Sequence, residues 1–260
     1  MNLERLELEI DDDVARLWLS RPEVRNAFDG RMVTELRAVL DQLATSSSVR
    51  VLVVGGRGEV FSAGADLEWM KEQAGFGREE NLREAREMAD VFFTLASLPK
   101  PVVARVQGAA LGGGVGLVAA CDIAVAAEGT RFGFPEVRLG LIPAVISPHV
   151  LGKIGESAAR EYFLTGERFE AEKAREIGLV RAVVPAGNLD AAVEARVEEL
   201  RQAGPGAVAE AKALLRAVAG RGLDDVLHET AERIAAVRAS PEGQEGLRAF
   251  LEKRKPNWVP

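Results

Sequence analysis

The sequence predicts an α/β protein, with a mainly parallel sheet in residues 1–190 and a helical region at 191–260. Two observations support this. In the first part, short apolar runs alternate with stretches of helical periodicity, the order typical of layered α/β folds. After residue 150, the periodicity is almost entirely helical.

The first part begins with a strand-like segment at residues 14–19, followed by apolar residues at helical spacing over 33–43. The continuous apolar run 51–54, ended by Gly55-Gly56, is typical of a strand buried on both faces. Helical spacing returns over 82–93. Two further strands are expected at 101–106 and 123–126.

The second part predicts five helices and one strand, at 179–184. The helices are expected at 157–164, 170–177, 189–202, 207–218 and 223–237. A helical tail rich in Ala and Leu is typical of a segment that packs against a neighbouring subunit.

The amino-acid composition excludes several classes of function. The chain has 260 residues, 47% of them hydrophobic, and a net charge of -7, which opposes nucleic-acid binding. No apolar run approaches the roughly 20 residues of a membrane span, and no signal peptide is recognisable, so a cytoplasmic protein is expected. One cysteine, Cys121, excludes an intrachain disulfide, and two histidines, His149 and His228, leave little for a metal site. We expect no metal or redox cofactor, and chemistry based on carboxylates and backbone.

Two glycine-containing turns follow predicted strands, at residues 61–67 and 108–114. Where such a turn opens a helix, its unpaired N–H groups favour a negative charge, and two converging N–H groups would form an oxyanion hole. Tight packing alone is the alternative interpretation. Neither turn has the spacing of a phosphate-binding P-loop or a dinucleotide fingerprint.

Several motifs follow one another in a characteristic order: Arg21-Pro22 with Asn26-Ala27, 61–67, 99–104 leading to 108–114, Cys121-Asp122, 132–141 and 250–256. With these motifs the chain resembles the enoyl-CoA hydratase/isomerase family, also called the crotonase family, over essentially its whole length. The resemblance implies a spiral of ββα units with a C-terminal helical trimerisation region, in a homotrimer or a homohexamer. It implies an acyl-CoA thioester substrate, so that coenzyme A is part of the substrate.

The resemblance also implies site residues. The backbone N–H groups of Ala65 and Gly113 would form the oxyanion hole, and Glu136 matches a catalytic glutamate of the family. Lys253, with Phe250, would reach the coenzyme bound to an adjacent subunit, although Lys253 could equally be part of a solvated helix end. The full set implied for substrate binding is Arg25, Ala63, Gly64, Asp66, Leu67, Gly112, Phe250 and Lys253.

Glu136 can exchange protons near neutral pH if an apolar acyl pocket raises its pKa. The alternative is a surface glutamate paired with Arg138. Hydratases of the best-known branch carry a second glutamate where this chain has Gly116.

A single glutamate fits three outcomes: hydration by Glu136 with the water held by other groups, Δ3,Δ2-enoyl-CoA isomerisation, or an inactive paralogue. Residues 141–148 and 65–70 resemble the branch of methylglutaconyl-CoA and related branched-chain hydratases, which favours the hydratase.

Other residues have simpler interpretations. His149 could contact substrate or water, or only begin a helix; His228 is expected at the surface and Cys121 in the core. No Gly-x-Ser-x-Gly elbow supports a serine hydrolase. One relative of the family binds RNA, but the net charge and the lack of basic-aromatic interleaving oppose that function here.

Overall fold

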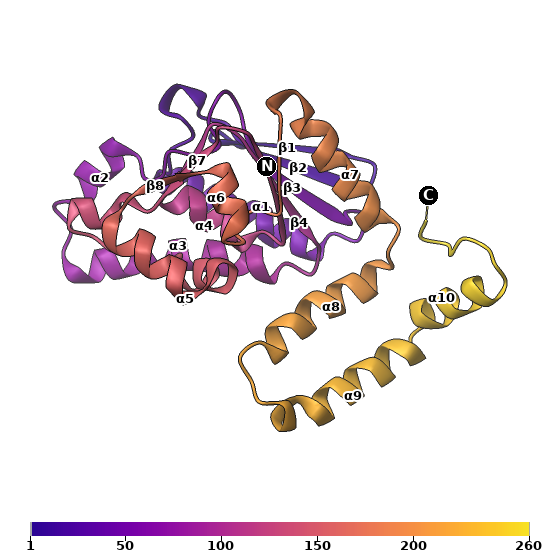
Figure 1. The fold of residues 1–260 in the computed structure, drawn as a ribbon. Coiled ribbons are helices and arrows are strands. Elements are labelled where there is room, and N and C mark those ends of the chain that lie inside the picture. Colours follow the sequence, from indigo (N-terminus) through magenta and orange to yellow (C-terminus); the bar gives the residue numbers. More distant parts are fainter. Residues whose placement is uncertain (1, 260) are drawn as a thin grey trace.

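The computed structural model describes residues 2–259 and contains a six-stranded main sheet in the order β1-β2-β3-β4-β6-β9 (Figure 1). Strands β1 and β2 are antiparallel, and every other neighbouring pair is parallel. The strands are β1 (Leu6–Asp11), β2 (Val14–Leu19), β3 (Val51–Gly56), β4 (Val102–Val106), β6 (Ile123–Ala127) and β9 (Ala182–Val184).

A second, three-stranded sheet has the order β5-β7-β8, with β5 (Ala109–Leu111), β7 (Arg131–Gly133) and β8 (Arg168–Glu170). Strands β5 and β7 are parallel and in register, Leu111 opposite Gly133. The segments that leave their carboxyl ends, from Gly112 and from Phe134, therefore start side by side.

Helices cover both faces of the main sheet. Helices α1 and α3 pack together, α4 packs on α3 and α5, and α7 packs on β3, β4 and β6. The helices are α1 (Gly30–Thr45), α2 (Leu67–Gln73), α3 (Arg78–Ser97), α4 (Gly113–Ala120), α5 (Ser147–Thr165), α6 (Ala171–Glu176), α7 (Leu189–Arg201), α8 (Pro205–Val218), α9 (Leu223–Ala239) and α10 (Pro241–Leu251). Three short 3-10 helices span Pro22–Val24, Pro135–Leu139 and Ala186–Asn188.

Strand β3 shows why its sequence is continuously apolar. Successive side chains point to opposite faces of a strand, and here both faces are covered. Leu52 and Val54 belong to the main core, while Val51 and Val53 contact the cluster that α7 covers with Val193 and other residues. Burial of such a side chain stabilises the fold by about 1.5–3 kcal/mol.

Helices α8, α9 and α10 extend away from the sheets (Figure 1). Lys212 on α8 connects these helices to the rest of the protein. Its Nζ donates to Asp122 Oδ2 at 2.7 Å and to the carbonyl of Lys100 at 3.0 Å. None of the helices in residues 2–259 is long and apolar enough to cross a membrane.

The strands predicted at 14–19, 51–54, 101–106 and 123–126 are confirmed, as are the predicted helices. Other details differ from the prediction. The helix expected at 157–164 is preceded by a further helical stretch from Ser147, and the two meet at Gly155, whose φ of 70° and ψ of 171° are not helical. Helices α2, α4 and α10 were not predicted. The strand expected from Leu179 begins at Ala182, and β8 adds a second strand after residue 150. Helix α7 begins at Leu189 and lies on the sheet, so it crosses the division predicted at residue 190, which stays a prediction.

Candidate active site

The two glycine-containing turns predicted from the sequence lie against each other. A Cβ atom on Gly64 would lie 2.9 Å from the carbonyl oxygen of Leu111, and one on Gly114 would lie 2.9 Å from that of Ser62. A β-bridge joins Ser62 to Ala110. Gly64 and Gly112 have positive φ, 92° and 50°, which favours glycine. Backbone contact between the turns therefore requires glycine at these positions.

Each turn presents an N–H group without an acceptor in the described part of the chain. Phe28 exchanges backbone hydrogen bonds with Gly64 and Asp66, at 2.7 and 2.8 Å, which turns the N–H of Ala65 away from Phe28. Gly113 is the first residue of α4, where a helix leaves its N–H groups unpaired. A Cβ atom on Gly64 would lie only 3.9 Å from the Cα of Gly112. Because Gly64 precedes Ala65 and Gly112 precedes Gly113, the two N–H donors belong to one site.

Glu136 lies beside the same turns. Its Oε1 is 3.1 Å from the position of a Cβ on Gly112, and its Oε2 is buried without a hydrogen-bond partner in residues 2–259. Burial raises the pKa of this carboxyl above its ordinary value, and a hydrogen bond to its own backbone opposes the rise only in part. Arg138 does not pair with it, since Arg138 Nε donates to the carbonyl of Thr165 at 3.3 Å.

The position of the absent second glutamate is filled by apolar side chains. A Cβ on Gly116 would overlap Cγ2 of Ile146 and lie 3.0 Å from Cε1 of Phe92. Ile146 is buried at the start of α5. A carboxylate at position 116 would therefore require Ile146 to shift or to be smaller.

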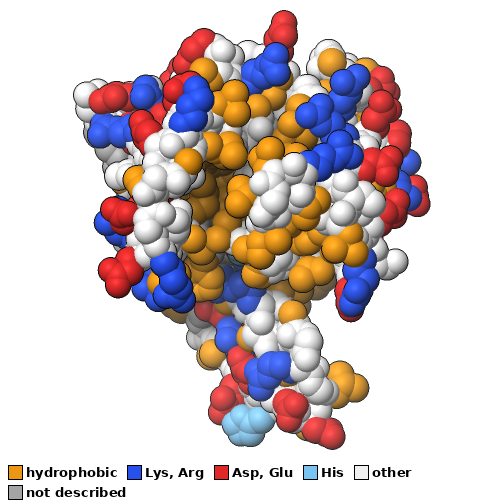
Figure 2. All heavy atoms as spheres, turned by 90° about the vertical axis from the view of Figure 1, so that its left-hand side faces the viewer, with side chains coloured by type: hydrophobic (Ala, Val, Ile, Leu, Met, Phe, Trp, Pro, Cys, Tyr) orange, Lys and Arg blue, Asp and Glu red, His pale blue; other side chains and the backbone are white. Residues whose placement is uncertain are grey.

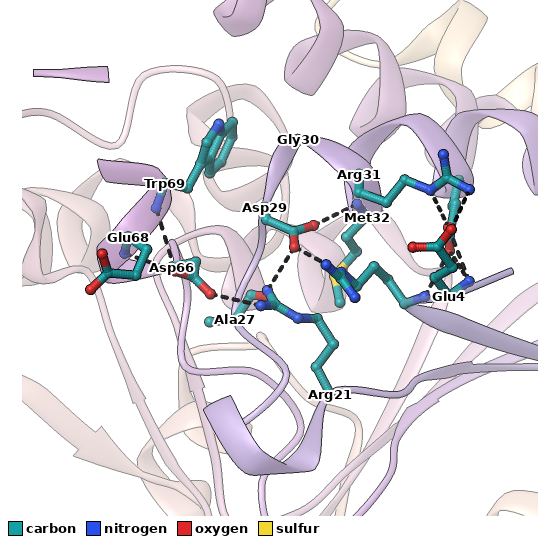
Figure 3. A network of polar contacts seen from close by, with 12 residues as sticks. Glu4, Arg21, Ala27, Asp29, Gly30, Arg31, Met32, Asp66, Glu68 and Trp69 are labelled. Atoms are coloured by element: carbon teal, nitrogen blue, oxygen red, sulfur yellow. Dashed lines mark hydrogen bonds and ion pairs between the residues drawn. The ribbon is translucent and has the colours of Figure 1, made fainter. Parts of the chain in front are cut away.

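Asp66, expected at the coenzyme, uses its carboxylate within the protein (Figure 3). It caps α2 by accepting the N–H groups of Glu68 at 2.8 Å and Trp69 at 3.4 Å, and it pairs with Arg21 at 3.0 Å. Burial alone would raise the pKa of Asp66, but the N–H groups and the guanidinium outweigh it, and the pKa is lowered. Its carboxylate therefore positions the loop that carries Ala65.

Arg21 links this cap to another one. It pairs with Asp29 at 3.1 Å, and Asp29 caps α1 by accepting the N–H of Met32 at 2.7 Å (Figure 3). Asn26, buried beside it with a φ of 54°, accepts from the N–H of Arg21 and donates to the carbonyl of Val60. The sequence motif Arg21-Pro22 with Asn26-Ala27 thus supports the loop from behind.

Arg25 and Ala63 are neighbours: the Ala63 N–H donates to the Arg25 carbonyl at 2.9 Å. Both line a cavity of about 420 Å³ that also contains Leu111, from the other turn. Arg131 and Arg168 line it too, and neither was predicted from the sequence. The sequence did hold a signal for these two arginines. Each precedes a buried phenylalanine, Phe132 or Phe169, and this alternation indicates that the arginines face outward from the small sheet.

The remaining predicted residues lie apart from one another. Leu67 is the first residue of α2 and is 74% exposed. Phe250, 80% exposed, lies near the end of α10, and Lys253 follows that helix. Figure 1 places α10 on the opposite side of the protomer from α2. Phe250 and Lys253 therefore do not reach the loop of Ala65 within one chain.

Helices α2, α3 and α5 lie on one side of the molecule (Figure 1), and Figure 2 views this side. Hydrophobic side chains gather there around a hollow. In residues 2–259, no group of three or more His, Cys, Asp and Glu side chains is placed to hold a metal ion. The site itself combines two free N–H donors with a carboxyl group that has one buried, unpartnered oxygen.

A model of the enoyl-CoA hydratase/isomerase family matches residues 9–259. The crystal structure of an enoyl-CoA hydratase from Shewanella pealeana is 43% identical and superposes with a TM-score of 0.96, covering 98% of this chain and 96% of that one. AtuE of Pseudomonas aeruginosa is 40% identical, with a TM-score of 0.95 over 99% and 100% of the two chains. The 2,3-dehydroadipyl-CoA hydratase of Escherichia coli is 34% identical over 94% of each chain.

The chain therefore belongs to the enoyl-CoA hydratase/isomerase family. Its fold is the crotonase fold with helices at the C-terminus, as predicted. The prediction of an enzyme of this family is also confirmed.

The packing around Gly116 generates a stability prediction. Gly116→Ala should lower the free energy of unfolding by about 1–3 kcal/mol, since the added methyl group overlaps Ile146. Gly152→Ala is the matched control: Gly152 lies on α5, and a Cβ there meets nothing within 4 Å. This control should stabilise the protein by up to about 1 kcal/mol. Urea unfolding of both variants measures the difference, and an unchanged Gly116→Ala midpoint would contradict the packing.

Burial of Glu136 generates a pH prediction. Its folded-state pKa is raised, so its favourable contribution to stability is complete below the unfolded-state pKa and is lost as pH rises through the folded-state pKa. Glu136→Gln removes this loss. The gain in melting temperature over wild type should therefore be larger at about pH 8 than at about pH 5. A Glu136→Gln gain that does not depend on pH would argue against the raised pKa.

Proposed function

We propose that this protein is an enoyl-CoA hydratase that adds water reversibly to a 2-enoyl-CoA thioester through an enolate. The observation that supports it most is the position of Glu136. Its unpartnered, buried carboxyl oxygen adjoins Gly112, the residue directly before the free N–H of Gly113. A proton-transfer group and an oxyanion donor thus lie at neighbouring residues.

The two N–H donors would bind the thioester oxygen. As the enolate forms, negative charge accumulates on this oxygen, so fixed donors stabilise the transition state more than the ground state. The donors need no reorganisation, because the glycine contacts and the caps around Arg21 hold both turns in place.

Glu136 would carry out both proton transfers. As the water oxygen bonds to C3 of the enoyl group, the carboxylate takes one water proton, and the C2=C3 electrons move into the enolate. Glu136 then donates that proton to C2, which yields the 3-hydroxyacyl thioester. A raised pKa suits this double role, because the group must both accept and release a proton near neutral pH.

The acyl group is proposed to be branched, as in methylglutaconyl-CoA. Residues 141–148 resemble that branch, and Ile146 within them contacts Gly116 and thereby shapes the site. The apolar hollow in Figure 2 suits a hydrocarbon chain.

Δ3,Δ2-enoyl-CoA isomerisation is the second candidate, and the packing of Ile146 against Gly116 favours it. One carboxylate suffices to move a proton between two carbons of an enolate. Here Glu136 is that carboxylate, and Ile146 fills the position of a second one beside Gly116. Both candidates use Glu136, Ala65 and Gly113 in the same roles.

The coenzyme part of the proposal rests on charge. Arg25, Arg131 and Arg168 line one cavity beside Ala63, and cationic side chains there suit the coenzyme phosphates. Phe250 and Lys253 would complete the binding site of an adjacent subunit, which requires a homotrimer or homohexamer formed through residues 191–260. We also propose a cytoplasmic location, which fits a single, buried, reduced cysteine.

Glu136→Gln should lower hydration turnover by about 10²-fold or more, as expected for loss of an acid/base group. The assay offers crotonyl-CoA, 3-methylglutaconyl-CoA and a 3-enoyl-CoA, and identifies products by mass and double-bond position. Gain of one water marks a hydratase; a shifted double bond at unchanged mass marks the isomerase. Glu128→Gln should retain wild-type turnover, and full activity of Glu136→Gln would refute its role.

Lys253→Ala should raise the Michaelis constant for acyl-CoA and spare an acyl-pantetheine substrate, which lacks the nucleotide. The reason is that Lys253 is proposed to contact only the nucleotide of the coenzyme. Lys173→Ala serves as the control, since Lys173 is a half-buried lysine paired with Glu176 on α6. Equal effects of Lys253→Ala on both substrates would contradict the contact.

A further inference from the structure

His149 and the first turn of α4 lie near the same aromatic ring, that of Phe92. Its imidazole lies 6.3 Å, centroid to centroid, from the ring of Phe92. The same Phe92 ring lies 3.9 Å from the position of a Cβ on Gly113 and 3.0 Å from that of one on Gly116. Phe92 thus connects His149 to the oxyanion turn and to the position of the absent glutamate.

Helix α5 explains this placement. Ile146 precedes the helix and His149 follows three residues later, a spacing that puts both on one helix face. Ile146 contacts Gly116 through this face. The segment that packs against Gly116 therefore also supplies a half-buried imidazole near the same Phe92 ring.

The imidazole is free to bind a small ligand. No hydrogen bond or ion pair in the described residues uses its ring nitrogens, and only its backbone N–H is engaged, with the carbonyl of Ile146 at 3.1 Å. Burial lowers the pKa of His149, which favours the neutral form of the ring. A neutral imidazole has one donor and one acceptor nitrogen, the groups needed to hold a water molecule in a fixed orientation.

We propose that His149 binds and orients the water that adds to C3, in place of the second glutamate excluded by Ile146. This inference rests on the proposed hydratase function. His149 accepts a hydrogen bond from the water, Glu136 takes the other water proton, and the oxygen attacks C3. His149 gains and loses no proton, so the proton balance at Glu136 is unchanged.

The test separates water addition from proton transfer. Hydration of crotonyl-CoA needs the oriented water, whereas deuterium exchange at C2 of butyryl-CoA in D₂O needs only Glu136 and the oxyanion hole. His149→Leu should lower the kcat of hydration roughly 10²-fold, the effect of a misplaced reactant, and leave KM and deuterium exchange near wild type. His149→Gln, whose amide can also bind water, should recover part of the hydration. His228→Gln, an exposed residue of α9, should behave as wild type.

The other possible outcomes would contradict either the water-binding role of His149 or the hydratase proposal. Equal losses of hydration and exchange in His149→Leu would show a structural role and refute water binding. Undiminished hydration in His149→Leu would also refute it. If the wild-type enzyme adds water to none of the enoyl thioesters while exchange proceeds, the hydratase proposal itself fails, and the inference about His149 fails with it.

Discussion

The close backbone contact between residues 62–64 and 111–114 is the constraint on which the rest of the site depends. At Gly64 and Gly114 a Cβ would lie 2.9 Å from a carbonyl oxygen of the opposite turn, a distance that Cβ atoms essentially never show. Glycine at these positions therefore allows the backbones of two turns, which follow different strands, to lie in direct contact. The free N–H of Ala65, the start of α4 and the carboxyl of Glu136 beside Gly112 all follow from this contact.

Two carboxylates near this contact have opposite electrostatic environments, and this separates their roles. Asp66 receives two N–H groups and a guanidinium, which lower its pKa and keep it ionised as a structural cap. Among residues 2–259, Glu136 has no cationic partner and only a hydrogen bond to its own backbone, and burial raises its pKa. Pairs of acids whose pKa values are pushed apart are typical of sites in which one group moves protons. Here the structural acid supports the loop that carries Ala65.

The buried strands could be predicted from the sequence because a short, continuous apolar run ended by glycine is typical of a strand covered on both faces, as at Val51–Gly56. Strands β5, β7 and β8 could not, since three residues are too few to show an alternation. Glu136 was predictable only through its motif, whereas Asp66 was recognisable as a helix cap by residue type. The contact of Ile146 with Gly116 joins residues thirty positions apart, and one sequence has no signal for such a pair.

That contact also restricts how such an enzyme can change during evolution. Ile146 in its present position overlaps any side chain added at position 116. Introducing the carboxylate first places it against a buried, branched side chain, and shortening Ile146 first leaves a cavity that costs about 2–5 kcal/mol for an Ile to Ala change. Either single change would therefore lower the stability of this protein. A carboxylate at position 116 needs a second change at residue 146, so the two positions have to change together for this site to hold two carboxylates.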